Sequence, residues 1–341
     1  MEEGKYSMKA IQFLEANHIG VCDVAMPEVP EGWALIKVSH AGICGTDLNI
    51  YAGTHPRAKA PLTMGHEFSG VVAQDCERFP AGTRVTVYPL ISCGKCEPCQ
   101  SGNKHVCNTL GLYGIDTAGG MAEYCIIPED QLIPLPENVS MKVGAFIEPI
   151  AVTVHTLRET GFVPGDNAIV FGCGTIGLCL ALTLKQFGVG VLLLVETDAA
   201  RQALARELGF EVINPMEVNL DEVVAAHTNG NGFDRVYDCA GAGPVAACLL
   251  DVVKVRGQIV IVASYKKPPQ MPFFKGMAKE VSIHFVRVYR QKDFAIAAEM
   301  AEKEPLFEKI ITHVLPAEKA QEGFDLLFTP GTGAVKVMFE F

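Results

Sequence analysis

The amino-acid sequence predicts an α/β protein with a β-rich domain followed by a parallel-sheet domain. The chain has 341 residues, which is more than one ordinary hydrophobic core accommodates. Before about residue 140 the apolar residues fall in short β-type runs, and after it apolar strands alternate with amphipathic helices. Alternation of this kind is typical of a parallel sheet covered by helices. We therefore expect two domains.

The first domain is predicted from short strands bounded by Pro27, Pro30, Gly32 and similar turn residues. Residues 91–110 differ, because they are rich in Cys, Gly and Lys and have no apolar periodicity, so they cannot fold around a core of their own. The strands expected in this part of the chain cover 9–13, 19–24, 34–38, 68–73, 84–88 and 121–127.

The second domain is expected to begin with one long helix over 142–159. After Tyr289 come a helix and short strands ending in 335–341, so the last fifty or so residues are expected to return to the first domain. The strands of the parallel sheet are predicted at 167–171, 191–195, 235–237, 258–262 and 281–285.

Charge and hydropathy exclude several function classes. The formal net charge of -11 and the lack of a Lys/Arg-rich run argue against nucleic-acid binding. No run of about eighteen apolar residues is present, and residues 1–10 carry charges where a signal peptide needs an apolar stretch. We expect a cytoplasmic protein without a membrane partner, whose twelve cysteines are thiols or metal ligands.

A dinucleotide fingerprint follows the predicted strand 167–171. Gly172, Gly174 and Gly177 form GxGxxG, with Thr175 and Ile176 between the last two glycines. The glycines permit a tight turn and a close approach to a pyrophosphate, whose charge the helix N-terminus stabilises.

The acid at the end of the next strand points to NAD. Glu196 lies about twenty residues after the glycines, where a carboxylate binds ribose hydroxyls and repels a 2′-phosphate. The alternative is a solvated residue at a strand end. Arg201 keeps NADP as a minority option if it binds that phosphate, or it faces solvent.

Four cysteines share one short loop and predict a structural zinc site. Their spacing is Cys-x-x-Cys-x-x-Cys-x7-Cys, and four thiolates suit closed tetrahedral coordination of zinc. An iron–sulfur cluster is the rival, but the proline that commonly follows the fourth cysteine in ferredoxins is absent. The cysteines are Cys93, Cys96, Cys99 and Cys107.

A second, dispersed set has the composition of a catalytic zinc site. Cys44, His66, Glu67 and Glu148 supply a thiolate, an imidazole and carboxylates, which with one open position polarise an alcohol or carbonyl oxygen. Each residue also has an ordinary explanation, since a lone cysteine is usually a core residue and a glutamate before a proline is usually on the surface.

The order of these motifs resembles the zinc-dependent medium-chain alcohol dehydrogenases, nearest the sorbitol, butanediol and threonine dehydrogenase branch. The resemblance implies a GroES-like catalytic domain over 1–149 and 288–341, a Rossmann domain over 150–287, and an active site between them. It covers essentially the whole chain. The motifs that carry it are Gly42-Ile-Cys-Gly-Thr-Asp47, Gly65-His-Glu67, the four-cysteine lobe, Glu148-Pro149 and Gly172-Cys-Gly-Thr-Ile-Gly177.

The resemblance implies that Cys44 and His66 bind the catalytic zinc, with Glu67 as a ligand in the polyol-type enzymes. Glu148 stands where the liver-type enzymes have a cysteine ligand. Adjacent residues of an extended segment point to opposite sides, so His66 and Glu67 cannot both bind the metal without a local bend. We expect Glu67, Glu148 and water to exchange around one zinc.

Further roles are implied by position. Thr46 resembles the family's proton-relay hydroxyl, although it also fits the N-cap of a short helix after Asp47. Many relatives have a histidine three residues later, where this chain has Asn49, so the proton is expected to leave through water or Glu148.

The resemblance also implies contacts with the cofactor and with the substrate. Lys336 matches a position that reaches the cofactor pyrophosphate, or it is plain surface charge. The positions where related polyol enzymes gather substrate contacts are Tyr51, Arg287 and Tyr289, for which core packing is the alternative.

The predicted function is hydride transfer between a secondary alcohol and NAD, giving the ketone, with two zinc ions per subunit. The substrate classes left open are polyols, diols, sugar-derived alcohols and amino alcohols. The resemblance implies a homo-oligomer, a tetramer or a dimer. The alternatives are a catalytically weak NAD-binding sensor or structural protein and a zinc-free quinone or enoyl reductase.

Overall fold

The computed structural model describes residues 7–341 and divides the chain into two compact units. One unit contains the chain up to Glu148 together with Arg290–Phe341, and the other contains Pro149–Tyr289. These limits differ by one or two residues from the domain limits expected from the sequence. Residues 1–6 lie outside the described part, so most of the stretch that argues against a signal peptide is not described. Within residues 7–341, no helix has the length and apolar character needed to span a membrane.

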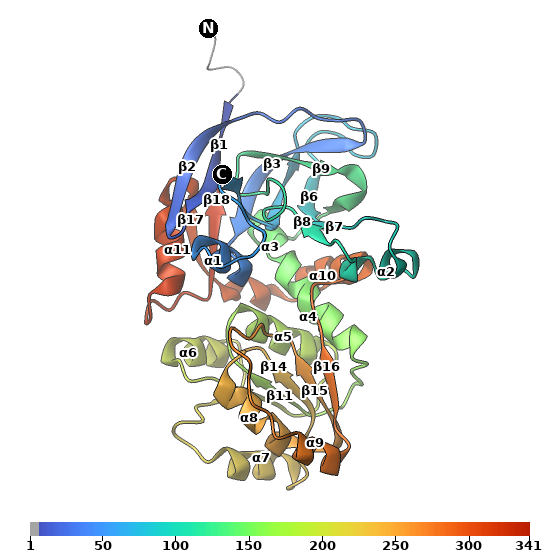
Figure 1. The fold of residues 1–341 in the computed structure, drawn as a ribbon, viewed down its shortest axis with the longest axis vertical. Helices are drawn as coiled ribbons and strands as arrows, with labels where there is room; N and C mark the ends of the chain where they lie inside the picture. Colours follow the sequence, from blue (N-terminus) through green and yellow to red (C-terminus); the bar gives the residue numbers. More distant parts are fainter. Residues whose placement is uncertain (1–6) are drawn as a thin grey trace. The chain divides into compact units, whose positions relative to one another are not determined.

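The first unit is built on a seven-stranded sheet that joins both ends of the chain. In strand order the sheet reads β10-β6-β5-β3-β18-β17, and β9 also pairs with β3. The C-terminal strands, red in Figure 1, lie among the blue N-terminal strands of this unit. The strands are β3 (Trp33–Gly42), β5 (Glu67–Val72), β6 (Arg84–Val87), β9 (Tyr124–Pro128), β10 (Leu132–Pro134), β17 (Ile311–Pro316) and β18 (Lys336–Glu340).

Smaller elements complete the first unit. A three-stranded sheet has the order β2-β1-β4, and the pair β7–β8 flanks the cysteine-rich loop. The strands are β1 (Ser7–Glu15), β2 (His18–Ala25), β4 (Leu62–Thr63), β7 (Leu90–Ile91) and β8 (Gly111–Leu112). The helices are α1 (Gly45–Tyr51), α2 (Glu97–Gln100), α3 (Met141–Ala145), α10 (Gln291–Lys303) and α11 (Ala320–Phe328).

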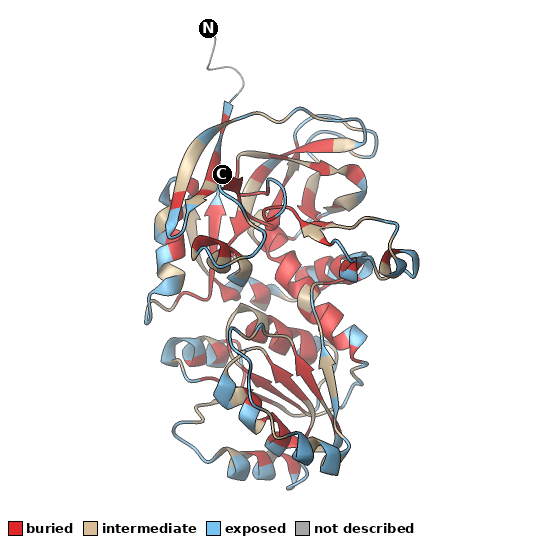
Figure 2. Ribbon diagram, in the orientation of Figure 1, coloured by how far each residue is buried: buried red, intermediate tan, exposed pale blue. Residues whose placement is uncertain are grey.

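The second unit is a six-stranded parallel sheet in the order β13-β12-β11-β14-β15-β16. This order reverses beside β11, and in such sheets ligands bind at the carboxyl ends of the strands at the point of reversal. Figure 2 shows the inner strands largely buried, and the edge strand β16 and the outer faces of the helices partly exposed. The strands are β11 (Ala168–Phe171), β12 (Leu192–Val195), β13 (Val212–Ile213), β14 (Phe233–Asp238), β15 (Val253–Ile261) and β16 (Ser282–Phe285).

Helices pack around this sheet, whose core includes Phe171, Phe233 and Ile259. All three side chains are buried to 2% exposure or less, as expected for strands covered on both faces. The helices are α4 (Ile147–Glu159), α5 (Thr175–Gln186), α6 (Ala199–Glu207), α7 (Leu220–Thr228), α8 (Gly243–Val252) and α9 (Phe273–Lys279).

The single helix predicted over 142–159 is wrong, because the structure has two. Helix α3 ends at Ala145, and α4 begins at Ile147 after Phe146. Proline has no backbone N–H, and its ring clashes with the carbonyl group four residues earlier in a continuous helix. For Pro149 that carbonyl belongs to Ala145, so the helix has to restart just before the proline.

Candidate functional site

Cys44 lies between the end of β3 and the start of α1 and caps that helix. Its backbone is extended (φ -98°, ψ 161°), and its N–H donates to Asp47 Oδ2 over 2.8 Å. Helix α1 begins at Gly45, so Thr46 lies inside the first turn. The alternative role of Thr46 as the N-cap is therefore wrong, because Cys44 holds that position. The thiol is fixed at the base of a helix.

His66 and Glu67 converge with Cys44. One possible ligand atom from each of the three residues lies within 4.8 Å of the other two. His66 and Glu67 are each 2% exposed. The expected obstacle, adjacent side chains pointing apart, is overcome because His66 lies in a bend just before β5 and not in the extended strand. The preceding Gly65 has φ +94°, a backbone conformation that only glycine adopts without strain.

Asp47 lies beside the His66 ring, a proximity that sequence reasoning missed. Asp47 is fully buried, and its Oδ1 lies 3.9 Å from His66 Nδ1. Both atoms lack a hydrogen-bond partner within the described chain. Nδ1 faces the carboxylate, which leaves Nε2 for a metal, and histidine ligands usually donate their second N–H to such a carboxylate. The sequence signal that could have indicated this proximity is the acidic residue three positions after Cys44.

Electrostatics at this cluster favour metal binding. Burial by itself lowers the pKa of His66, but the negative groups of Cys44 and Asp47 outweigh it and raise the pKa well above 6.5. Burial raises the pKa of Asp47, opposed by His66. A divalent cation compensates the same negative groups without a proton, so the site is built to hold positive charge.

Glu148 lies at the start of α4 and is 7% exposed. Its charge contributes to raising the pKa of both His66 and Lys336, which places it near the cluster. Its carboxylate is not among the three ligand groups that lie within 4.8 Å of one another. The choice between Glu67 and Glu148 as a zinc ligand therefore stays a prediction.

Lys336 is buried beside these residues. Its side chain is 1% exposed, and its ammonium group donates to Glu67 Oε2 and, over 2.9 Å, to the carbonyl of Ile43. Burial lowers the pKa of Lys336, but Glu67 and the other negative groups outweigh this and raise it above its usual value. The predicted contact with the cofactor pyrophosphate is untested, and the ion pair with Glu67 was not foreseen.

The four cysteines of the loop gather as predicted for one metal. All four offer sulfur atoms within 4.8 Å of one another. The sulfur of Cys96 lies 3.4 Å from that of Cys99 and 3.8 Å from that of Cys107. A tetrahedron with metal–sulfur bonds of about 2.3 Å has sulfur–sulfur edges of about 3.8 Å, so the geometry fits zinc.

Backbone N–H groups stabilise the thiolate form of one of these cysteines. The N–H of Cys93 donates to Cys107 Sγ over 3.3 Å, and together with the N–H of Thr109 it lowers the pKa of Cys107 to about 6. Burial raises the pKa of Cys99 to about 12. Loading a metal at neutral pH therefore releases protons from the loop.

The glycine-rich turn connects β11 to α5. Gly172 has φ +96°, and Gly174 is the N-cap of α5, which starts at Thr175 and continues through Ile176. A Cβ atom on Gly177 would overlap the carbonyl oxygen of Gly172. Only glycine at this position lets the helix pack so closely on the strand, as the dinucleotide fingerprint requires.

Glu196 lies directly after β12 and is tied to this turn. Its Oε2 accepts the N–H of Cys173 over 2.7 Å, and its Oε1 accepts those of Thr197 and Asp198. The Thr197 hydroxyl also donates to Oε1 over 3.5 Å, which gives the carboxylate four hydrogen-bond donors. Arg201 lies on α6 and is exposed. The alternative of Glu196 as a merely solvated residue is inconsistent with its 8% exposure.

The three predicted substrate contacts have different surroundings. The Tyr51 hydroxyl accepts from Gln321 over 2.7 Å and donates to Asp325, and its ring stacks on Phe324. Tyr289 is fully buried and Arg287 is exposed. Both the hydroxyl and the ring of Tyr51 are thus in contact with α11. None of the three predicted contacts is tested by these placements.

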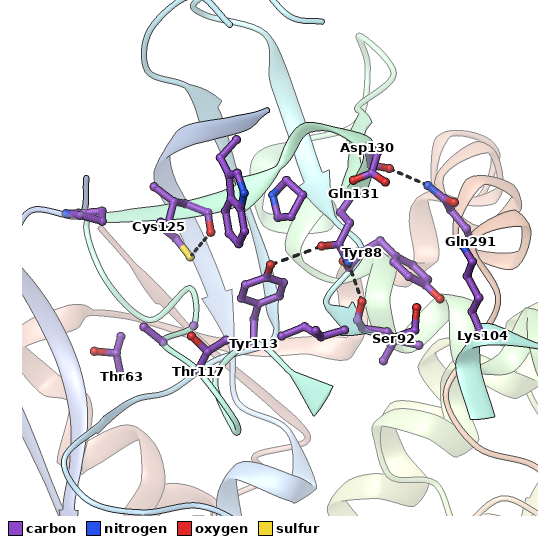
Figure 3. Close-up of a pocket in the computed structure, with 18 of the residues that line it drawn as sticks. Thr63, Tyr88, Ser92, Lys104, Tyr113, Thr117, Cys125, Asp130, Gln131 and Gln291 are labelled. Carbon is purple, nitrogen blue, oxygen red and sulfur yellow. Dashed lines mark hydrogen bonds between the residues drawn. The ribbon is translucent and has the colours of Figure 1, made fainter. Parts of the chain in front are cut away.

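A cavity of about 1160 Å³ also lies on the first unit (Figure 3). The Tyr113 hydroxyl donates to Gln131 Oε1 over 3.4 Å, and the Gln131 amide donates to the carbonyl of Leu90. Cys93 is among the lining residues, whereas Cys44, His66 and Glu67 are not. This cavity borders the cysteine loop and is not the catalytic metal site.

Comparison with known proteins agrees with this geometry. Residues 30–137 match the alcohol dehydrogenase GroES-like domain, and residues 175–303 match the zinc-binding dehydrogenase domain. A 2-dehydro-3-deoxy-L-galactonate 5-dehydrogenase from Pseudoalteromonas atlantica is 35% identical over 86% of this chain and 87% of its own. The chain belongs to the zinc-dependent medium-chain alcohol dehydrogenase family. The predicted family, its GroES-like and Rossmann folds and its dehydrogenase activity are confirmed.

Further relatives show the range of this dehydrogenase family. A sorbitol dehydrogenase from Halalkalibacterium halodurans is 33% identical over 92% of this chain and 96% of its own. An alcohol dehydrogenase from Escherichia coli CFT073, solved with NADH, has a TM-score of 0.90 at 28% identity and covers 98% of this chain and 100% of its own. A zinc-binding dehydrogenase from Sinorhizobium meliloti 1021, bound to NADP, also has a TM-score of 0.90, with 28% identity and coverage of 99% and 100%. This dehydrogenase therefore uses zinc and a nicotinamide cofactor.

Zinc affinity at the Cys44–His66 site is expected to rise with pH. The metal-free protein keeps a proton on His66 above pH 6.5, and zinc needs the neutral ring, so binding must displace that proton. We expect the affinity to rise about tenfold per pH unit just above 6.5, measured by competition with a chelator. Asp47→Asn removes a group that raises the His66 pKa and should flatten the slope. An affinity independent of pH would contradict this account.

Proposed function

We propose that this dehydrogenase oxidises a secondary alcohol of the polyol, diol, sugar-derived or amino-alcohol type to the ketone, with NAD as hydride acceptor and two zinc ions per subunit. The observation that carries the proposal is the convergence of the half-buried Cys44 with the buried His66 and Glu67. A zinc ion bound there supplies the Lewis acidity that lowers the pKa of a substrate hydroxyl. The four-cysteine loop holds the second ion and has no open position for a substrate.

The residues of this chain move the proton that the alcohol loses. Thr46 lies in the first turn of α1, two residues after the ligand Cys44, where its hydroxyl accepts a proton and passes another on. Asn49 cannot act as a base, so the next acceptor is water or the carboxylate of Glu148. Tyr51, Arg287 and Tyr289 stay proposed substrate contacts, and Lys336 a proposed pyrophosphate contact.

The choice of NAD over NADP is inferred from Glu196. A carboxylate at the end of the second strand binds the ribose hydroxyls and repels a 2′-phosphate. Three backbone N–H groups fix its position next to the glycine turn. Arg201, on the helix that follows, is the residue that would favour NADP. The cluster around Cys44 argues against a zinc-free reductase.

Turnover should depend on the catalytic cluster. We expect NADH formation, followed by absorbance, with at least one member of a panel of polyols, vicinal diols, sugar acids and amino alcohols. Cys44→Ser should reduce kcat/KM by more than about 100-fold, since losing even a residue that supports a metal ligand costs 10–100-fold. Cys22→Ser, a half-buried cysteine of β2, is the matched control. Tight NAD binding without turnover on the whole panel would favour the sensor.

Replacing Glu196 should shift cofactor choice. Glu196→Gln removes the charge that repels a 2′-phosphate, so the ratio of kcat/KM for NAD to that for NADP should fall at least about tenfold. Asp198→Asn removes the same charge two residues away while keeping an oxygen that accepts the Arg201 N–H. If both variants change the ratio equally, Glu196 does not select the cofactor.

We infer a homo-oligomer, a dimer or a tetramer, from an apolar edge of the second unit. Strand β16 is the sheet edge and exposes Phe285 (79%), and the adjacent α9 exposes Phe273 (73%) and Phe274 (76%). Figure 2 shows this helix largely exposed. An uncovered edge strand pairs readily with a second strand, and a twofold axis brings an identical one.

The oligomeric state tests this directly. We expect light scattering after size exclusion to give a dimer or tetramer, and Phe285→Asp to shift it to smaller species. Val163→Asp, at an exposed site away from this edge, should leave the mass unchanged. A monomeric wild-type protein would exclude the oligomer.

We also propose that the enzyme is cytoplasmic. None of the twelve cysteines, which all lie within residues 7–341, forms a disulfide, as expected for a reducing compartment. Recovery of the protein mainly from an exported fraction of its host would refute this location.

A further inference from the structure

The cavity beside the cysteine loop has the size of a small-molecule site. Its volume of about 1160 Å³ lies just above the usual range of about 300–1,000 Å³ for ligand pockets. All residues that line it belong to the first unit, and none of them is a proposed ligand of the catalytic zinc. A molecule bound in this cavity is therefore separate from the metal site at which the alcohol is proposed to bind.

Aromatic side chains form one wall of the cavity. The rings of Trp33 and Tyr113 lie edge to face with their centroids 6.5 Å apart, and Tyr124 also lines the cavity. The Tyr113 hydroxyl donates to Gln131, whose amide donates to the carbonyl of Tyr88 over 3.0 Å (Figure 3). Since these polar groups already bond to one another, a flat apolar occupant leaves none of them without a partner.

Positive charge gathers at another part of the same cavity. Lys104, Arg290 and Lys292 line it, and Asp130 is the one carboxylate among the described lining residues. This excess of positive charge contrasts with the formal net charge of -11 of the whole chain. In Figure 3, Lys104 lies to one side of the Tyr113 ring. A cavity lined mainly by one sign of charge attracts the opposite sign, so the favoured occupant is an anion.

The cationic part is held in shape by the start of α10. The Arg290 guanidinium donates through Nη2 to Asn103 Oδ1 over 3.0 Å, which joins α10 to the cysteine loop. The side-chain amide of the next residue, Gln291, donates to the carbonyl of Asp130 over 2.8 Å. These contacts fix the two backbone segments that carry the cations. Binding an anion there therefore costs little ordering of the chain.

We propose that this cavity is a second small-molecule site, which binds an organic anion with a flat aromatic body. The ring of the ligand packs against Trp33 and Tyr113. Its anionic group pairs with Lys104, Arg290 and Lys292. The inference goes beyond the proposed function and does not depend on it, because no residue of the catalytic cluster takes part.

The fluorescence of a single residue makes binding measurable without turnover. Trp33 is the one tryptophan of the 341 residues, and it lines the cavity. We expect 4-tert-butylbenzoate, which does not absorb where tryptophan is excited, to change the Trp33 emission of the zinc-loaded protein saturably, with one site per chain. The neutral 4-tert-butylbenzamide has the same ring and should bind at least about tenfold more weakly, because it cannot form charge-assisted contacts with the cations.

Variants of the lysines test the part played by charge. In Lys104→Met/Lys292→Met the affinity for the benzoate should fall at least about tenfold, toward that for the amide, while the affinity for the amide stays unchanged and shows that the cavity is intact. Lys303→Met, at the other end of α10 and outside the cavity, is the matched control and should alter neither affinity. If the double variant binds the benzoate as tightly as the wild-type protein, the lysines do not select an anion and the proposal is wrong.

A carboxylate can also bind zinc, so one more variant separates this cavity from the catalytic metal. Cys44 does not line the cavity, and Cys44→Ser should therefore leave the Trp33 signal and the affinity for the benzoate unchanged. A lower affinity in Cys44→Ser would mean that the anion binds at the catalytic cluster, and this would overturn the proposal. So would the lack of any saturable change in Trp33 emission, as expected if a second copy of the chain covers the cavity.

Discussion

The structure of the first unit depends on how negative charge is compensated in a buried space. Asp47, His66 and Glu67 are each exposed by 2% or less. His66 and Glu67 lie close to the Cys44 thiol, and Asp47 lies beside His66. Burying such groups without compensation costs several kcal/mol per charge. Lys336 supplies one positive group to Glu67, and the proton or metal at His66 supplies the other. Metal binding, proton release and the position of Glu67 are therefore linked.

The fold brings these groups together from distant parts of the chain. The sheet places β5, β3 and β18 side by side. The C-terminal strand β18 therefore brings its lysine next to residues that come from the first seventy positions of the chain. Helix α1 fixes Cys44 through Asp47, and His66 lies in a bend just before β5. In the second unit, glycines allow a helix to pack directly against a strand, as in dinucleotide-binding domains.

Local motifs were predictable because their physical basis is contained in a few adjacent residues. The four cysteines lie within fifteen positions of the sequence and come together in the structure, and GxGxxG describes one turn between a strand and a helix. The break between α3 and α4 was also predictable, since Pro149 excludes a continuous helix. The apolar periodicity of 142–159 nevertheless indicated a single helix. The bend at His66 lets His66 and Glu67 converge, and the sequence alone did not identify it.

Contacts between distant residues were not predictable. Lys336 and Glu67 are 269 positions apart, and their pairing depends on strand order and on the missing side chain of Gly42. Tyr51 is likewise held by α11, through Gln321, 270 positions away. A sequence identifies which residues can bind a metal or a proton, but strand order decides which of them meet.

The most direct test of this account is anomalous X-ray scattering from crystals of the zinc-loaded protein, measured on both sides of the zinc absorption edge. We expect two zinc peaks per chain, one within the four-cysteine loop and one bonded to Cys44 and His66. A single peak in the cysteine loop, or a second peak that does not contact Cys44 and His66, would contradict the account.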